Sequence, residues 1–356
     1  MFVAWRDLRF ARGRFLLITA VVALMCIMVG FLSGLTGGLT WQNVSGLLGV
    51  RGDRVLLAPA TPSSAPSFAD SQFSASQVEQ VLDIPGVSAE PVGISQLRAV
   101  AGDTRAAVAV IGGADRAVPD APRGDGSVVL STPAAIALEV DEGDTVTIAG
   151  LDFVVESIAG DLWYSHTPVI RTTIDDWRAL ASATGVQNPV ATALVVDDGA
   201  GLDWAAVAAT TDTVSQAPLL SLQWLPAFRS EIGSLLLMVG LLFGISALVV
   251  GAFFAVWTLQ RIGDIAVLKA LGASDRMLRL DALGQATLVL IVGAALGFGI
   301  VGVLGLVVGG ALPFVVSPLT TLLPAAVMFA LGLLGAALSL RSVTNADPLT
   351  ALGSNR

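Results

Sequence analysis

A carboxylate that borders an apolar segment is the side chain in this sequence with the clearest chemical potential. Glu231 directly precedes an uncharged stretch from Ile232 to Trp257, and Met25 and Met28 lie within another uncharged stretch. A carboxylate oxygen and a thioether sulfur can both ligate a haem iron held among apolar helices. A carboxylate in the first turn of a helix is also stabilised by the helix dipole without any ligand, and methionines pack in apolar helices. Glu231, Met28 and Met25 are the candidate residues for such a ligand, and no other metal site is predicted.

The other reactive side chains lack companions in the sequence. His166 is the one histidine, and the one cysteine, Cys26, lies in an apolar run. Because no Cys pair or Ser/His/Asp set accompanies them, a loop or core histidine without chemistry is the favoured interpretation. The acidic pairs at 175–176 and 197–198 consist of adjacent residues, whose side chains point apart. We therefore expect no catalytic residues and no intrinsic cofactor, so the chain is not expected to be an enzyme.

Composition indicates a membrane protein. The 356 residues are 54% hydrophobic and only 13% charged, with a mean hydropathy of +0.79, which is outside the range of ordinary soluble domains. The acidic charge is concentrated in residues 41–230, which hold nine arginines against twenty-two acidic residues. No basic patch is interleaved with aromatic side chains, so nucleic acid is not an expected partner.

Four uncharged stretches are long enough to cross a hydrocarbon core about 30 Å thick at a rise of about 1.5 Å per residue. They predict transmembrane helices at 15–40, 231–257, 286–312 and 325–341. Arginine and lysine flank these stretches on one side, and the positive-inside rule then places residues 1–14, 258–285 and 342–356 in the cytoplasm. We expect a multi-pass protein of the cell membrane with both termini cytoplasmic, an outer domain at 41–230 and a short outer loop at 313–324, where prolines separate the last two spans.

A cleaved signal peptide is the alternative for the first span, because basic residues before an apolar stretch are also typical of signal peptides. The apolar stretch is too long, and residues 37–40 make a poor cleavage site, so an uncleaved anchor is favoured. Gly30, Gly34 and Gly38 recur at every fourth residue in this span, and Gly293 and Gly297 do so in the third. This spacing predicts close helix packing, part of it between subunits, although glycine is also common filler in such helices.

Residues 41–230 alternate strand patterns with helix starts, which predicts an α+β domain inserted between the first two spans. Residues 144–156 indicate two strands joined by a turn at Gly150, Ser76 to Glu79 resembles a capping box, and Thr173 precedes a helix start. The predicted fold class is therefore an α-helical membrane protein with four transmembrane helices and an α+β extracytoplasmic domain.

The predicted cytoplasmic loop at 258–285 contains a short amphipathic helix. Its apolar residues fall on one helical side, Gly272 is a natural helix stop, and Ser274 can cap the next helix. The segment Asp264-Ile265-Ala266-Val267-Leu268-Lys269-Ala270-Leu271-Gly272-Ala273 resembles the corresponding loop of the FtsX-like permease family, of the MacB and LolC type. Residues 4–9 are similar to the family's basic N-terminal amphipathic helix, and residues 347–352 to its closing motif.

The resemblance implies an ABC-type permease that works as a homodimer with two copies of a cytosolic ATPase. In this comparison Asp264, Ile265, Leu268, Lys269, Leu271 and Gly272 are the residues expected to couple the loop to that ATPase. The chain is most similar overall to the haem-exporting permeases of Gram-positive bacteria, which implies efflux of an amphiphilic compound, haem being the best candidate. The alternative is an FtsX-like regulator that transmits ATPase motion to an extracellular cell-wall hydrolase without transport.

Overall fold

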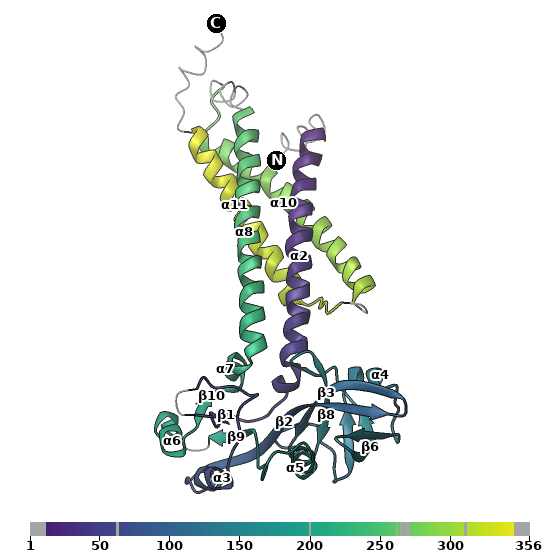
Figure 1. Cartoon of the computed structure of the whole chain (residues 1–356). Coiled ribbons are helices and arrows are strands. Elements are labelled where there is room, and N and C mark those ends of the chain that lie inside the picture. The colour runs from purple at the N-terminus through teal and green to yellow at the C-terminus, as the bar shows by residue number, and fades with distance from the viewer. Residues whose placement is uncertain are drawn as a thin grey trace. The chain divides into compact units, whose positions relative to one another are not determined.

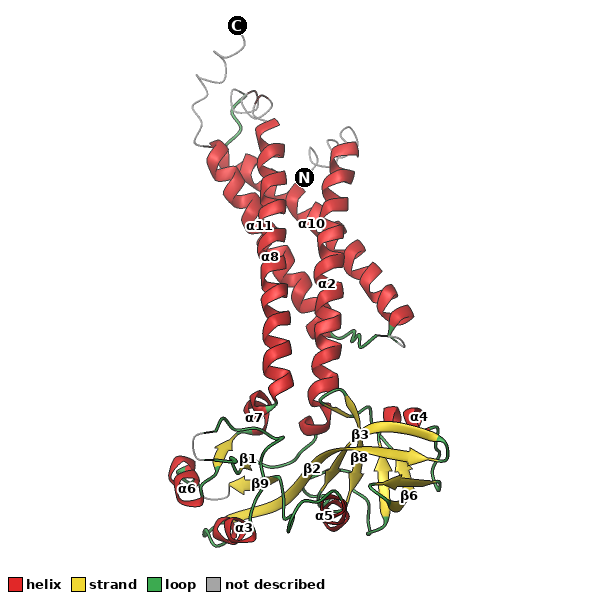
Figure 2. Ribbon diagram, in the orientation of Figure 1, coloured by secondary structure: helices red, strands yellow, loops and turns green. Residues whose placement is uncertain are grey.

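The structure is a computed structural model that describes residues 12–344, apart from 62–63, 199–200, 261–262, 264–266, 268–270 and 310–311. Two compact units make up the chain. We call Met1–Gly38 with Ser234–Arg356 the membrane unit, and Leu39–Gly233 the inserted domain. Figure 2 shows the membrane unit as helical and the inserted domain as strands with short helices.

Among the described residues, four helices are long and apolar enough to cross a membrane. They are labelled in Figure 1 as α2 (Arg12–Leu48), α8 (Pro226–Gln260), α10 (Asp275–Val308) and α11 (Pro318–Thr344). The inserted domain lies between the first and the second of them, so the predicted fold class is confirmed. The helices α2 and α8 are longer than the spans predicted at 15–40 and 231–257, because α2 ends and α8 begins with turns that belong to the inserted domain.

The last helix begins earlier than the prolines suggest. Residues 313–324 are predicted as a loop, whereas α11 starts at Pro318 and contains Pro324. Ser317 supplies the N-terminal cap, since its Oγ accepts a hydrogen bond from the Thr320 backbone N–H at 3.2 Å. A proline at the first helical position has the φ angle that the helix needs and lacks only an N–H that would have no partner. Pro318 therefore starts the helix instead of separating it from the preceding loop.

Small residues let the helices of the membrane unit approach closely. A Cβ atom on Gly30 would lie 2.9 Å from the Phe298 ring, and one on Gly293 would lie 2.6 Å from Val22 Cγ1. Gly38 packs against the carbonyl group of Pro313. The close packing predicted from the glycine spacing is thus confirmed, but these glycines make contacts within one chain. The expectation that some of these faces serve contacts between subunits stays a prediction.

The described residues of the inserted domain form ten strands in one mixed sheet. Its strands are β1 (Arg54–Leu57), β2 (Val87–Ala101), β3 (Thr104–Gly112), β4 (Ser127–Leu130), β5 (Thr145–Ile148), β6 (Leu151–Ile158), β7 (Trp163–Tyr164), β8 (Thr167–Thr172), β9 (Ala193–Asp198) and β10 (Val214–Gln216). Its helices are α3 (Ala75–Leu82), α4 (Thr132–Leu138), α5 (Ile174–Ala183), α6 (Trp204–Thr211), α7 (Pro218–Ser221) and the 3₁₀ turn η1 (Leu222–Trp224).

The long strand β2 belongs to two parts of this sheet. Its second half closes a ring in the order β2, β3, β8, β4, β6 and β5, because β5 pairs back with Ala99 and Val100. Its first half pairs with β9, and β1 and β10 extend that part. Separate apolar clusters are buried around the ring and on the two faces of the extension. Figure 2 shows β2 running across the domain as its longest strand.

Local signals in the sequence locate several of these elements. The hairpin of β5 and β6 turns at Ala149 and Gly150, which have φ angles of 50° and 84°. Thr173 caps α5 by accepting a hydrogen bond from the Asp176 N–H. Both the turn and the helix start agree with the prediction. The capping box of α3 consists of Ser74 and Gln77, two residues before the predicted one. A glutamine at the third helical position serves this motif as well as a glutamate does.

Asp176 in α5 gives a prediction on stability. Its side chain is buried and its Oδ2 accepts a hydrogen bond from the Gly126 N–H at 2.9 Å, yet burial raises the pKa of this carboxyl. A pKa above the unfolded value gives stability that is present at low pH and is lost as the pH rises through the folded pKa. Asp176→Asn is therefore expected to raise the melting temperature at pH 7 by about 2–4 °C, with the difference disappearing in acid.

Thermal melts of the full chain between pH 4 and pH 8 measure this effect. Asp103→Asn is the matched control, because Asp103 is exposed and is not among the charges that act on Asp176. A lower melting temperature for Asp176→Asn at pH 7 would mean that the bond from Gly126 outweighs the cost of burying the charge.

Candidate functional site

Three polar side chains from distant parts of the chain meet in the inserted domain. Glu231 Oε2 lies 2.8 Å from His166 Nε2 and accepts a hydrogen bond from Asn43 Nδ2 at 2.9 Å. Asn43 belongs to the last part of α2, Glu231 to the second turn of α8, and His166 to the turn between β7 and β8. Asn43 is completely buried, while the side chains of His166 and Glu231 are about one third exposed, at 35% and 33%. The group can therefore be reached from outside, with Asn43 at its base.

The turn that carries His166 has an uncommon backbone. Ser165 and His166 have φ angles of 48° and 65°, which are the left-handed values of a two-residue type I′ turn, normally taken by asparagine and glycine. Two hydrogen bonds to α2 hold this turn: Ser165 N–H donates to the Asn43 carbonyl at 3.0 Å, and His166 N–H to the Gln42 carbonyl at 2.9 Å. A strained backbone at a residue whose side chain joins a polar cluster suggests a functional role for that residue.

Side chains of α2 fasten the rest of this hairpin. Trp41 Nε1 donates to Asp161 Oδ2 at 3.0 Å, and Trp163 Nε1 donates to Asp161 Oδ1 at 2.7 Å. Ser45 Oγ accepts a hydrogen bond from the Trp163 N–H at 2.8 Å. Two indole rings thus share one carboxylate next to the turn of His166, and the hairpin is attached to α2 along about one turn of the helix, from Trp41 to Ser45.

The hydrogen positions in the cluster follow from its geometry. Two nitrogens, Asn43 Nδ2 and His166 Nε2, approach the same oxygen of Glu231 and can both donate to it. The 3.2 Å contact between these two nitrogens is then not a hydrogen bond, because both are donors. The amide oxygen of Asn43 is buried and has no hydrogen-bond partner among the described residues. A buried acceptor without a partner costs about 1–3 kcal/mol, so the cluster favours an additional donor.

Of the predicted haem-binding residues, the structure places Glu231 in this cluster and the two methionines elsewhere along α2. Met25 is half-buried in the membrane unit, where Ser246 Oγ donates to its sulfur at 3.7 Å. Met28 is 47% exposed. Met28 precedes Asn43 by fifteen residues in α2 and belongs to the membrane unit. A shared role of the methionines with Glu231 stays a prediction.

Asn43 and His166 are the site residues that the sequence did not reveal. Sequence alone predicts a histidine without partners at position 166, because its partners lie 123 and 65 residues away in sequence. Asn43 does carry a signal in the sequence. It is an amide within an uncharged, mostly apolar helix, and a polar side chain in such a place is often functional.

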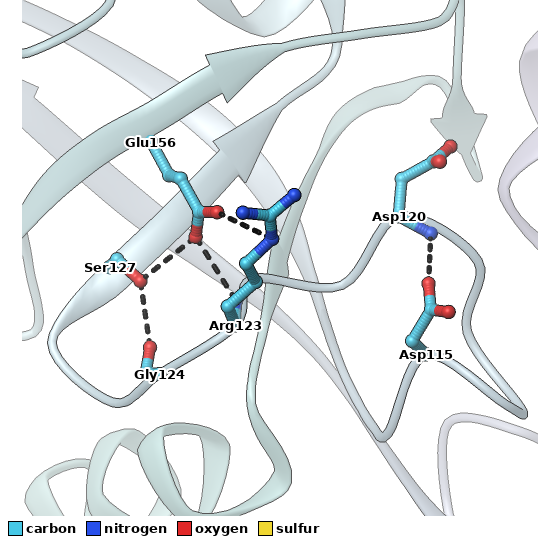
Figure 3. Close-up of polar contacts among 6 residues, drawn as sticks. All are labelled: Asp115, Asp120, Arg123, Gly124, Ser127 and Glu156. Atoms are coloured by element: carbon cyan, nitrogen blue, oxygen red, sulfur yellow. Dashed lines mark hydrogen bonds and ion pairs between the residues drawn. The ribbon is translucent and has the colours of Figure 1, made fainter.

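A second polar cluster in the inserted domain has a structural role. Figure 3 shows Glu156 accepting hydrogen bonds from the Arg123 N–H at 3.1 Å and from Ser127 Oγ at 3.3 Å. The Arg123 side chain is 96% exposed, so the contact fastens a surface loop to β6. In the part of the chain that the structure describes, no three His, Cys, Asp or Glu side chains are grouped to hold a metal ion.

The predicted coupling loop is described only in part. Asp264, Ile265, Leu268 and Lys269 lie outside the described residues. Leu271 N–H donates to the Val267 carbonyl at 3.0 Å, and Gly272 follows with a φ of 91°, the left-handed conformation of a helix stop. Ser274 then caps α10 by accepting a hydrogen bond from the Met277 N–H. The predicted stop and cap are confirmed, and Leu271 is left 80% exposed beside them.

The described part of the chain thus has four membrane-type helices, with a domain inserted after the first. Residues 236–348 match the family model described as FtsX-like permease C-terminal, which confirms the resemblance noted for the loop. Across 99% of both chains, the sequence is 27% identical to a Staphylococcus haemolyticus protein named "Putative hemin transport system permease protein HrtB".

Two further similarities were found. An uncharacterized ABC transporter permease of Mycobacterium tuberculosis is 24% identical, again over 99% of both chains. The periplasmic region of MacB from Actinobacillus actinomycetemcomitans aligns with 51% of this chain and 95% of its own, at 12% identity and a TM-score of 0.36.

Proposed function

We propose that this chain is the permease subunit of an ABC-type efflux system whose cargo is haem taken from the membrane. The observation that carries the proposal is the cluster of Glu231, His166 and Asn43, in which a carboxylate is held by two donors at the start of a membrane helix. The similarity to a hemin transport permease over the full length of both chains supports the same cargo.

The chemistry of the cluster suits a ferric haem. An anionic oxygen ligand neutralises part of the charge of the iron, and its orientation has to be held by hydrogen bonds from neighbouring groups. Asn43 and His166 both bind Oε2 of Glu231, which fixes the plane of the carboxylate.

The proposal includes a cytosolic ATPase in two copies and a second copy of this chain. A phosphate-binding loop needs a lysine followed by Ser or Thr, and the single lysine of these 356 residues, Lys269, is followed by Ala270. The loop of residues 258–285 would transmit the closure of the ATPase, with both termini in the cytoplasm and the inserted domain outside the cell.

Exposed Leu271 gives a test of that docking. Leu271→Asp is expected to reduce copurification of the ATPase at least about tenfold, because a charge on the contact surface cannot be paired in a buried interface. Leu319→Asp is the matched control, since Leu319 is 74% exposed at the first turn of α11, on the predicted outer side. Equal copurification by the two variants would place the docking surface elsewhere.

Disruption of the gene in its host separates export from the regulatory alternative. Export predicts growth inhibition by hemin and haem accumulation in the membrane fraction, both reversed by the intact gene and not by Glu231→Gln. A defect in cell separation that is independent of hemin, and that Glu231→Gln still reverses, would instead support an FtsX-like regulator of a cell-wall hydrolase.

A further inference from the structure

One edge of β2 is left open where the two parts of the sheet diverge. On the side opposite β3, residues Val87–Val92 pair with β9, and Ala99 and Val100 pair with β5. Between them, Gly93 to Arg98 have no strand partner on this side among the described residues. At about 3.3 Å per residue this gap is long enough for a short additional strand.

The backbone groups at the gap have a defined direction. Ile94 N–H donates to Thr192 Oγ1 at 2.8 Å, and the Val92 carbonyl accepts from the Thr192 N–H at 3.0 Å, so the even-numbered residues present their groups to the open edge. The pairing of β2 with β3 has no irregularity from Gly93 to Ala101. The even-numbered residues therefore continue to face the gap. Three of the groups that face it are the Ile94 carbonyl, the Gln96 N–H and the Gln96 carbonyl. No hydrogen bond to these three groups is formed by any described residue.

A cavity of about 870 Å³ follows this edge. Its walls are Ile94 to Leu97 of β2, the loop at 184–192, and the segment at 68–77. Trp177 closes one side, with its Nε1 donating to Ser95 Oγ at 3.0 Å. Uncharged side chains line all of it, with amides such as Gln187 and Asn188 beside aromatic rings such as Phe73 and Tyr164. This is unusual in a domain with twenty-two acidic residues between 41 and 230.

The geometry points to a binding site for an extended, uncharged peptide segment of another protein, which would add a short strand to β2 between β9 and β5. An added strand forms backbone hydrogen bonds to carbonyl and N–H groups on alternate residues of an open edge. Pockets beside this edge select the side chains of the added strand. The neutral walls favour a segment without charge, since a charged side chain would be desolvated without a partner. This site is independent of haem export and of the cluster around Glu231.

Panning a phage-displayed library of random heptapeptides on the purified full chain tests the proposal. We expect enriched peptides without charged residues. Gln96→Ala is the reference variant for these peptides, because alanine keeps the backbone groups that face the gap. Gln96→Pro removes the N–H that faces the gap but no bond to β3, and should bind at least about tenfold more weakly.

Backbone N-methylation of the selected peptide gives a second measurement that needs no variant protein. Methylation at alternate positions should abolish binding, while the positions between should tolerate it. The proposal is overturned if no peptide is enriched, or if methylation at every position leaves binding unchanged. A sugar ligand would also overturn the proposal. In that case a chito-oligosaccharide would bind the cavity in place of peptide, and Asn188→Ala would remove this binding while Gln96→Pro would not.

Discussion

Replacement of Gly38 by alanine is expected to lower the melting temperature of the full chain by about 5–10 °C. Gly38 lies in α2 where the carbonyl group of Pro313 packs directly against its Cα, so a Cβ has no room. The obstacle is backbone, and the Val315 N–H binds the Gly34 carbonyl one turn earlier at 3.1 Å. Because the loop is held on α2 at two points, it cannot move away cheaply, and overpacking of this kind costs about 1–3 kcal/mol or more.

Gly240→Ala is the matched control for that substitution. Gly240 is also in a membrane helix, and a Cβ there meets nothing within 4 Å. Alanine is the better helix former by up to about 1 kcal/mol, so the control should melt at or above the native temperature. Tryptophan fluorescence of the purified chain during heating measures both variants. If Gly38→Ala melts like Gly240→Ala, the docking of the loop on α2 is not as close as described.

Replacement of His166 by glycine is expected to weaken hemin binding about tenfold while the melting temperature stays the same or rises. The ring of His166 is one of the two donors to Glu231 Oε2, so its loss leaves the carboxylate less well oriented for a ligand. The backbone of residue 166 has a φ of 65°, and glycine adopts this conformation without strain. Stability and affinity should therefore change in opposite directions, which a purely structural histidine would not produce.

Ser165→Gly separates the two effects. Ser165 has the same left-handed conformation, with a φ of 48°, but its side chain makes no contact with Glu231 in the structure. The substitution relieves strain in the same turn and should leave hemin affinity unchanged. Spectroscopic titration with hemin measures affinity for both variants. A similar loss of affinity in Ser165→Gly would assign the effect to the turn and not to the ring.

The membrane helices could be predicted because their signal is contained in each segment alone. Uncharged runs of sufficient length, flanked by basic residues, identify spans without knowledge of their neighbours. Helix ends were less certain. Pro318 and Pro324 both indicate interruption in a sequence. Pro318 stands in the first turn, where a proline removes no intrahelical bond, and α11 continues through Pro324 in its interior.

The site could be predicted only in part, because its members depend on tertiary structure. Glu231 was identified from its position beside an apolar run, which is a local property. His166 and Asn43 became partners of Glu231 only when α2, α8 and the β7–β8 turn were brought together. The glycines are a second case in which the sequence alone does not identify the partner. Their spacing predicts close approach, but spacing cannot tell whether the approaching group, such as Phe298 against Gly30, comes from the same chain.

Hemin titration of the purified full chain, followed at the Soret band, tests the central claim most directly. The native chain and Met28→Leu are compared with Glu231→Gln, which keeps the size of the side chain and removes the anionic oxygen. The account predicts a saturable shift for the native chain and a loss of affinity of at least about tenfold for Glu231→Gln. An identical saturable shift in Glu231→Gln, or no saturable shift in the native chain, would contradict a haem site at Glu231.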